Sequence, residues 1–374
     1  MTEQTTSTNK TFVFKSVDSI GKEEIDKIAD DGFFTYGWFK TLENSKQKEF
    51  PSFYATFYEN GRLEAFAPCF IDKTDQYFIF GPYVIPFMKT VLNMGSRLRF
   101  SQNHVLLCYS PFCYRSKVSL GTSLNEDKAL DSVIRKIDDV CKKQKILFSS
   151  FLFVSEFDNN LSTCLQNFGY RQFFFRNCLY LDVRWNTFED YLQSLKHGIR
   201  NRIRREMRSC KEGGVIIEEI EDFKNLSTLF SSLFSNLYAK YQKDVEAPFT
   251  PSFYESLSDY AKEKTKVFIA KKKGVIVGFS VCIRHNDVLD VFHCGFNYEL
   301  MEKTDFVYFN LCYYEPIRWA IQEGIKKIYY RMTAEEVKYR RGCKPEKVYS
   351  FVKCHNKFVQ AQIGNYLKIR GKLT

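Results

Sequence analysis

Residues 266–297 read KVFIAKKKGVIVGFSVCIRHNDVLDVFHCGFN, and this stretch decides the fold. Three runs rich in valine, isoleucine and phenylalanine are separated at Lys273-Gly274 and Asn286-Asp287, two residue pairs typical of tight turns. Short apolar runs bounded by turn residues are typical of strands. The stretch therefore predicts an antiparallel meander of three strands.

The segments around the meander predict helices that flank a sheet. Apolar residues recur at helical spacing over 188–207, 226–241 and 308–322. A strand is expected at 326–333 and a last strand pair over 339–355. This order predicts an α+β (α/β) domain with a mixed central sheet.

The first half of the chain repeats this order of elements. A hairpin is predicted over 50–72, and the pattern Gly-x4-Phe-x2-Cys begins both at Gly61 and at Gly274. Further strands are expected at 76–82 and 103–109. A chain of 374 residues also exceeds the size at which one core usually keeps growing. We therefore predict two duplicated domains, residues 1–183 and 184–374.

The composition indicates a folded protein with a basic surface. Hydrophobic residues make up 44% of the chain and aromatic residues 17%, which is enough for a large packed core. The formal net charge of +11 favours anionic partners such as nucleotide phosphates, RNA or an acidic membrane face. A lysine-rich solubilising surface explains the same charge without any partner.

The cysteines and the N-terminus indicate a soluble cytoplasmic protein without a metal site. The 12 cysteines are scattered, no CxxC pair occurs, and no cysteine–histidine group has zinc-ligand spacing. The start MTEQTTSTNK lacks the apolar core of a secretory signal. No apolar run approaches the roughly 20 residues that a transmembrane helix needs.

Several segments carry a resemblance to a known family. The second half resembles the N-acyltransferase (GNAT) fold in its Fem-type aminoacyl transferase branch, and FFTYGWFKTLE at 33–43 resembles the entry to the first helix of those proteins. The segments in the second half are LKHGIRNRIRREMRSCKEGGVIIEEI (195–220), GVIVGFSV (274–281), RWAIQEGIKKIYYRM (318–332) and VKYRRGCKPEKVYSF (337–351).

The resemblance implies two tandem GNAT-like domains that transfer an acyl group from a thioester or an aminoacyl ester to an amine. The chain departs from the family in two respects. No stretch has the uninterrupted heptads of the coiled-coil arm that many Fem-type cell-wall ligases carry. The glycine-rich pyrophosphate loop of simple acetyltransferases is also missing, and NYELMEKTDFV (297–307) holds its place.

The loop KYRRGCKP (338–345) is the first candidate for the reaction site. Converging cations, Lys338 and Arg341 among them, are suited to bind a carboxylate or phosphate, or to polarise the acyl carbonyl. Arg331 and Arg340 are expected to bind the substrate. A basic surface turn explains the same residues.

The sequence indicates the residues for proton transfer and acceptor binding less clearly than it indicates the cationic loop. His293 and Glu335 are candidate groups to accept a proton from the attacking amine, although a lone histidine on a strand is more often structural. Tyr36, Trp38 and Tyr83 lie in aromatic clusters that either line an acceptor pocket or belong to the core.

A pyrophosphate site is expected at the start of the helix that follows the meander. Free backbone N–H groups and the helix dipole favour an anion there. Lys303, Thr304, Tyr308 and Asn310 lie close to this start in the sequence. An ordinary loop–helix junction is the alternative.

The helix within 195–212 is strongly basic. Arg200, Arg204, Arg205 and Arg208 are expected to point away from its apolar stripe. Arginine is suited to bind phosphate, so the helix predicts either contact with tRNA or a solvated face paired with nearby glutamates.

The sequence as a whole favours an N-acyltransferase that uses acyl-coenzyme A as donor and an amino acid, peptide or amino-bearing metabolite as acceptor. The first alternative is a Fem-type transferase that uses aminoacyl-tRNA. The second alternative, from a different class, is a non-catalytic RNA- or peptide-binding module on the same fold.

Overall fold

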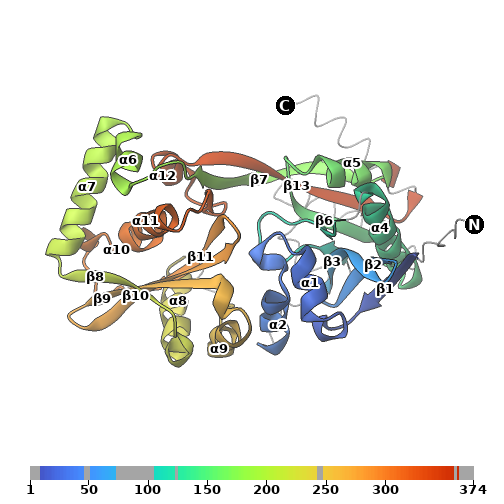
Figure 1. The fold of residues 1–374 in the computed structure, drawn as a ribbon, viewed down its shortest axis with the longest axis horizontal. Helices are drawn as coiled ribbons and strands as arrows, with labels where there is room; N and C mark the ends of the chain where they lie inside the picture. The colour runs from blue at the N-terminus through green and yellow to red at the C-terminus, as the bar shows by residue number, and fades with distance from the viewer. Residues whose placement is uncertain are drawn as a thin grey trace, which may run out of the picture. The chain divides into compact units, whose positions relative to one another are not determined.

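The computed structural model describes residues 9–45, 51–72, 105–122, 125–241, 247–357 and 360–361. The chain forms two compact units (Figure 1). Unit 1 comprises Met1–Ala29, Pro51–Asn177 and Lys347–Thr374, and unit 2 comprises Asp30–Phe50 and Cys178–Glu346. Among the described residues, no helix is long and apolar enough to cross a membrane.

The two units do not divide at residue 183, where we placed the domain boundary. Residues 30–50 lie in unit 2, and residues from 347 onward lie in unit 1. The two segments have different reasons: the end of the chain follows a strand that joins the sheet supplying its hydrogen bonds, whereas helix α2 (Tyr36–Asn44) packs on α9 (Pro251–Tyr260), where the Thr41 hydroxyl donates to the Ser256 carbonyl at 3.3 Å. Strand β13 accordingly pairs with β6 of unit 1.

Unit 1 is a mixed sheet in the order β1-β2-β3-β4-β6-β13, with the start of β7 also in this unit. Strand β4 runs parallel to β6, and the other pairs along this path from β1 to β13 are antiparallel. Its elements are β1 (Asn9–Phe14), α1 (Lys22–Ile28), β2 (Phe53–Glu59), β3 (Arg62–Asp72), β4 (Val105–Cys108), β5 (Ser119–Leu120), α4 (Glu126–Lys143), β6 (Phe148–Ser155), α5 (Asn159–Asn167), β7 (Arg171–Asp182) and β13 (Lys344–Cys354).

In unit 2 the strands of the mixed sheet follow the order β7-β12-β11-β10-β9-β8, with β7 contributing its end. Strands β11 and β12 are parallel, and the remaining pairs are antiparallel. Its strands are β8 (Val215–Ile220), β9 (Thr265–Lys272), β10 (Val275–His285), β11 (Val288–Phe296) and β12 (Lys327–Tyr329), and its helices are α2 (Tyr36–Asn44), α6 (Phe188–Gln193), α7 (His197–Glu212), α8 (Ser227–Tyr241), α9 (Pro251–Tyr260), α10 (Val307–Phe309), α11 (Glu315–Gln322) and α12 (Glu335–Tyr339).

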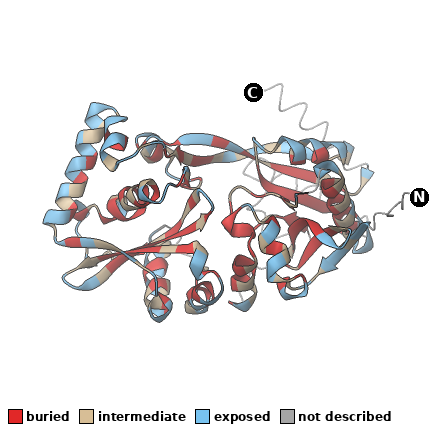
Figure 2. Cartoon of the chain, in the orientation of Figure 1, coloured by how far each residue is buried: buried red, intermediate tan, exposed pale blue. Residues whose placement is uncertain are grey.

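Helices cover both faces of the unit 2 sheet (Figure 1). On one face α8 packs against β10, where the rings of Phe230 and Phe279 stack with centroids 4.2 Å apart. On the other face α11 packs against β9 through Trp319 and Phe268. The strands are buried between these layers (Figure 2).

The predicted mixed sheets with flanking helices and the meander β9-β10-β11 are confirmed. Both copies of the repeated glycine pattern begin at a hairpin turn. Gly61 and Gly274 each have φ +79°, a left-handed conformation that glycine adopts without strain. The predicted strand at 76–82 lies outside the described residues.

The last predicted strand pair, over 339–355, is wrong in its first half. Residues 335–339 form the short helix α12, and a single strand, β13, follows. Lys338 therefore lies on a helix rather than in a loop. The helix is too short for apolar periodicity to reveal it.

Candidate active site

The site begins where the parallel strands β11 and β12 part. They are paired from Val288–Lys327 to Asp290–Tyr329, and no pairing between them follows in the described residues. A β-bulge at Phe292 bends β11, since His293 pairs with Val281 but Val291 pairs with Cys282. The carboxyl ends of parallel strands meet at one edge of a sheet, where ligands of open α/β sheets bind.

Three non-glycine residues with left-handed backbone follow these two strands. Phe306 (φ 47°) comes just before α10, while Arg331 (φ 64°) and Ala334 (φ 54°) lie between β12 and α12. Such conformations are costly for residues with a side chain and tend to cluster at functional sites. The backbone therefore marks this edge of the sheet as the candidate site.

Lys338 projects from α12 into this region. Its side chain is buried, with the residue 3% exposed, and its Nζ donates to the Arg331 carbonyl at 3.2 Å. Burial lowers the pKa of Lys338 to about 8, and the nearby Arg331 guanidinium also lowers it. Lys338 is therefore a buried ammonium that can release its proton in a physiological pH range.

Arg341 is held by an ion pair within the fold. Its Nη2 lies 3.0 Å from Glu206 Oε2 on α7 and 2.8 Å from the Tyr314 hydroxyl, and its Nη1 donates to the Val337 carbonyl. The guanidinium also lies 4.2 Å from the centre of the Phe309 ring. The alternative of a basic surface turn does not describe Arg341, which is only 5% exposed.

The other predicted residues on this segment differ in exposure. The Arg331 guanidinium lies over the Phe292 ring at 5.1 Å and donates to the Phe292 carbonyl. Arg340 points outward with its side chain 48% exposed and forms an ion pair with Glu336. Glu335 accepts a hydrogen bond from the Tyr339 hydroxyl at 3.1 Å.

His293 lies on the face covered by α8 and α9. Its Nε2 is 2.9 Å from the Tyr254 hydroxyl, and the rings of Phe234 and Phe249 pack against it. Burial holds the pKa of His293 well below its usual range, so the ring is neutral at pH 7. The Nδ1 atom is buried without a hydrogen-bond partner among the described residues.

The predicted acceptor residues lie mainly in the core. Trp38 is 1% exposed and packs edge-on against the rings of Phe33 and Phe292. Tyr36, the first residue of α2, is half-buried. Tyr83 lies outside the described residues.

The predicted pyrophosphate residues lie along the loop and the first turns after β11. Lys303 is exposed, and the Thr304 carbonyl accepts from the Ser209 hydroxyl at 2.7 Å. Asn310 is buried and its Nδ2 donates to the Phe306 carbonyl at 3.0 Å. The Tyr308 hydroxyl lies 3.3 Å from that of Tyr313. Asn310 is therefore committed to holding the start of the helix.

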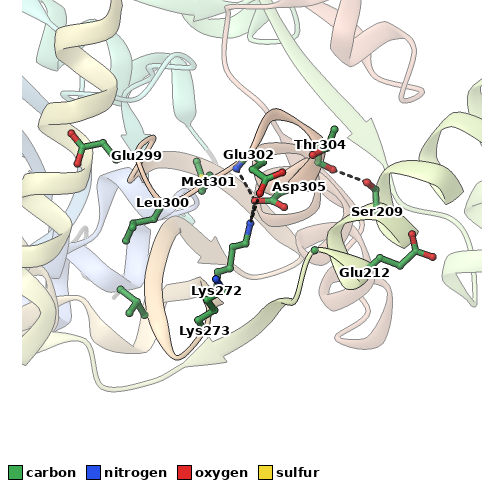
Figure 3. Close-up of a pocket in the computed structure, with 12 residues that line it drawn as sticks. Ser209, Glu212, Lys272, Lys273, Glu299, Leu300, Met301, Glu302, Thr304 and Asp305 are labelled. Carbon is green, nitrogen blue, oxygen red and sulfur yellow. Dashed lines mark hydrogen bonds and ion pairs between the residues drawn. The ribbon is translucent and has the colours of Figure 1, made fainter.

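A pocket of about 670 Å³ lies beside this loop, between the end of α7 and the β9–β10 turn (Figure 3). Asp305 points to Lys272, with Oδ2 2.7 Å from Nζ, and accepts from the Glu302 amide (Figure 3). Four carboxylates and two lysines line the pocket. This balance of charge is unfavourable for a pyrophosphate.

The arginines predicted to point outward from α7 do so, and Figure 2 shows the helix exposed along its outer side. Arg204 forms an ion pair with Glu189, and Arg200 donates to Gln193 at 2.9 Å. Arg205 and Arg208 are exposed and form no ion pair among the described residues. The helix therefore presents positive charge to solvent.

Glu206 and Tyr314 were missed in the sequence. Glu206 is fully buried and accepts from Arg202, Arg341 and Tyr314. Its position three residues after Ile203 places it on the apolar stripe of α7, which is a usable signal for a buried carboxylate. Tyr314 lies in a π-helical turn, Asn310–Tyr314, which periodicity does not reveal.

Within the part of the chain that the structure describes, no group of three or more His, Cys, Asp or Glu side chains could hold a metal ion.

Comparison with known proteins identifies the family. The model of the FemAB-like family, described as peptidoglycan biosynthesis/recognition, matches residues 16–373, so the chain belongs to this family. A comparison with curated proteins gives no match.

Solved structures support the fold. The chain is similar to FemX, with a TM-score of 0.60, 10% identity, and coverage of 91% of this chain and 98% of that one. It is also similar to L-PGS from Bacillus licheniformis, with a TM-score of 0.53, 12% identity, and coverage of 86% and 93%. At these identities the likeness establishes the tandem fold and leaves the reaction to be argued from the site.

Proposed function

We propose that this FemAB-like protein transfers an aminoacyl group from tRNA to an amine, at the opening between β11 and β12. The observation that carries the proposal is the buried Lys338 ammonium at the strained edge where these strands part. Family membership and the outward arginines of α7 support the choice of donor.

The reaction is an acyl transfer. The neutral acceptor amine attacks the ester carbonyl carbon, a C–N bond forms, and the C–O bond to the tRNA ribose breaks. The proton lost by the amine leaves with the ribose oxygen. Negative charge grows on the carbonyl oxygen during attack, so a preorganised donor at that position lowers the barrier.

Lys338 is the proposed donor to that oxygen. An ammonium has three N–H groups, and one of those of Lys338 donates to the Arg331 carbonyl. The acyl carbonyl enters between the parted strands and accepts from another. In this proposal Arg331 and Arg340 bind substrate near Lys338, and Glu335 or His293 exchanges the amine proton. Arg341 acts through the fold, because its guanidinium is bonded to Glu206.

Contact with tRNA is assigned to α7. Arg200, Arg204, Arg205 and Arg208 lie along the same helix and can reach successive phosphates. Acyl-coenzyme A, the donor that the sequence favours, would place its pyrophosphate near Lys303, Thr304, Tyr308 and Asn310. The acidic lining of the adjacent pocket argues for the RNA-borne donor instead.

A donor assay tests the proposal. The protein is incubated with labelled aminoacyl-tRNA or with labelled acyl-coenzyme A and a panel of amines, peptides and amino sugars, and base-stable amide product is measured. We expect product from aminoacyl-tRNA. Transfer only from the thioester would assign the donor to coenzyme A, and tRNA binding without any product would indicate a binding module.

A charge reversal tests the assignment of α7. Changing Arg204, Arg205 and Arg208 to glutamate should weaken tRNA binding and reduce the slope of log affinity against log salt by about 0.7–0.9 per lost phosphate contact. The control reverses Lys142, Lys143 and Lys145, which are exposed in unit 1. Equal losses in both variants would indicate attraction by net charge alone.

A further inference from the structure

Glu206 connects the basic helix to the segment that carries Lys338. It lies on α7 and is 0% exposed, although its neighbours on both sides, Arg205 and Met207, are exposed or half-buried. A buried carboxylate requires partners, because removal from water strongly disfavours the charged form. The partners of Glu206 come from three different segments of unit 2.

One partner is exposed and two are buried. Arg202 Nε donates to Oε1 at 2.8 Å from the solvent side of α7, with its side chain 44% exposed. Arg341 Nη2 donates to Oε2 at 3.0 Å, and the Tyr314 hydroxyl donates to the same oxygen. The Glu206 carbonyl also accepts from Asn310 Nδ2 at 3.3 Å.

Arg341 carries this connection to Lys338. The Arg341 amide donates to the Lys338 carbonyl at 2.9 Å, and Arg341 Nη1 donates to the Val337 carbonyl at 3.1 Å. The Arg341 carbonyl accepts from the Tyr191 hydroxyl of α6 at 3.1 Å. The guanidinium thus clamps the last turn of α12, the turn from which Lys338 projects.

We infer that Glu206 is a positioning residue, which fixes Lys338 at the strand opening by neutralising and orienting Arg341. The inference rests on the proposed role of Lys338. Glu206 touches no reacting atom. Its carboxylate is divided between Arg202, on the solvent side of α7, and Arg341, behind the reaction site, and the buried bond to Arg341 is the one that holds Lys338 in place.

The sequence alone assigns no such role. A glutamate among arginines is ordinarily a solvated partner for them. Here its hydrogen bonds to Arg341 and Tyr314 are shielded from water, and truncation would leave a buried guanidinium without its counter-charge. The geometry therefore distinguishes Glu206 from Glu212, which is exposed near the end of the same helix.

The test measures the pH dependence of Lys338 acetylation, which needs no substrate. Glu206→Gln keeps the size of the side chain and removes its charge, and Arg202→Gln is the matched control because it removes only the exposed partner. Acetylation of Lys338 by acetic anhydride is followed across pH by peptide mass spectrometry. Groups that influence this titration are Cys178 on β7, and Cys343, Arg331 and Glu335 around α12.

In the wild type and in Arg202→Gln, the midpoint of labelling should lie near pH 8. In Glu206→Gln it should rise toward 10.5, the value of an exposed lysine, because α12 loosens and Lys338 reaches water. Turnover should fall tenfold or more while the Michaelis constants stay within twofold. An unchanged midpoint and turnover in a folded Glu206→Gln protein would overturn the inference.

A second variant serves if Glu206→Gln fails to fold. Tyr314→Phe removes one hydrogen bond to Glu206 and should move the midpoint in the same direction by a smaller amount; an unmoved midpoint would contradict positioning. Different results would contradict the role of Lys338 in the reaction and the positioning role of Glu206. If Lys338→Met keeps full turnover while Glu206→Gln still shifts the labelling, the reaction assignment is wrong and the positioning role stands.

Discussion

The parallel strand pair of unit 1, β4–β6, and that of unit 2, β11–β12, are followed by the same backbone conformation but by different side chains. The last paired residues are Phe151 on β6 and Tyr329 on β12. Two residues beyond each, the backbone turns left-handed, at Phe153 (φ 60°) and Arg331 (φ 64°). The resemblance between the halves therefore extends to a strained position that no turn signal marks.

The two carbonyls at this position have different partners. The Phe153 carbonyl accepts from the backbone amide of Ser116 at 2.8 Å, and a parallel bridge between Ser116 and Val154 closes the strands again. The Arg331 carbonyl accepts from the backbone amide of Leu179 on β7 at 3.0 Å and also from the Lys338 ammonium at 3.2 Å. Both carbonyls thus bond a backbone amide, and the carbonyl in unit 2 bonds a buried cation in addition.

The side chains repeat this difference. Phe153 lies among the rings of Tyr109, Tyr114 and Phe175, with centroids 5.0–6.0 Å apart. The corresponding region of unit 2 holds Arg331 and Lys338. We assign the proposed chemistry to unit 2 because Lys338 supplies a cationic donor there, which stabilises a developing oxyanion.

The largest expected effect is on stability in unit 2. Arg341→Ala removes the buried counter-charge of Glu206, leaves it only the half-exposed Arg202, and should lower the free energy of unfolding by about 3–5 kcal/mol. Arg340→Ala, one residue away and exposed, should change it by less than about 0.5 kcal/mol. Urea denaturation of both variants measures the contrast. Equally small changes in the free energy of unfolding would mean that the Arg341–Glu206 ion pair does not stabilise unit 2.

The second prediction compares turnover after a substitution in each unit. Lys338→Met should lower turnover by about 10²-fold, the scale for loss of one preorganised donor. Ser116→Ala, at the partner of the corresponding carbonyl in unit 1, should leave turnover unchanged. Steady-state kinetics decides. A rise in the Michaelis constant with unchanged turnover would instead assign Lys338 to ground-state binding of an acceptor carboxylate.

The third prediction concerns pH. The folded-state pKa of Lys338 is lowered from 10.5 to about 8, so between these values the unfolded chain binds more protons. Stability should therefore rise from pH 8 to 10.5, by on the order of 3 kcal/mol, relative to Lys338→Met. Turnover should fall as the pH rises through about 8, because the folded enzyme loses the ammonium there. Parallel pH–stability curves for the two proteins would refute the burial of the charge.

The smallest effect is expected in unit 1. Tyr114→Leu removes an edge-to-face contact with Phe153 and should cost about 1 kcal/mol of stability while turnover is retained. Thermal unfolding and kinetics on one preparation measure both. A loss of turnover larger than the loss of folded protein would give the aromatic opening a part in the reaction.

Much of the fold could be predicted because the signals are local. The turns at Gly61 and Gly274 are encoded by neighbouring residues, and so is the capping box of Thr187 and Asp190 that begins α6. Helix α12 could not be predicted, because five residues show no period and its first residue follows the left-handed Ala334.

The candidate site was only partly predictable. The sequence drew attention to residues 338–345 as a cationic segment, but it could not distinguish Lys338 and Arg341, which are buried, from Arg340, which is exposed. Adjacent positions on a short helix face different environments, and which of them meets Glu206 depends on a residue more than a hundred positions away.

By itself, the sequence determined the strands and turns of the meander, the duplicated pattern and the basic face of α7, because each depends on residues within a few positions of one another. Only the tertiary structure decided the exchange of residues 30–50 and 347–374 between the units, the burial of Lys338 and the ion pair of Arg341 with Glu206. Burial and charge pairing are set by segments that meet in space, so desolvation and the pKa of a lysine follow from the fold rather than from its neighbours in the chain.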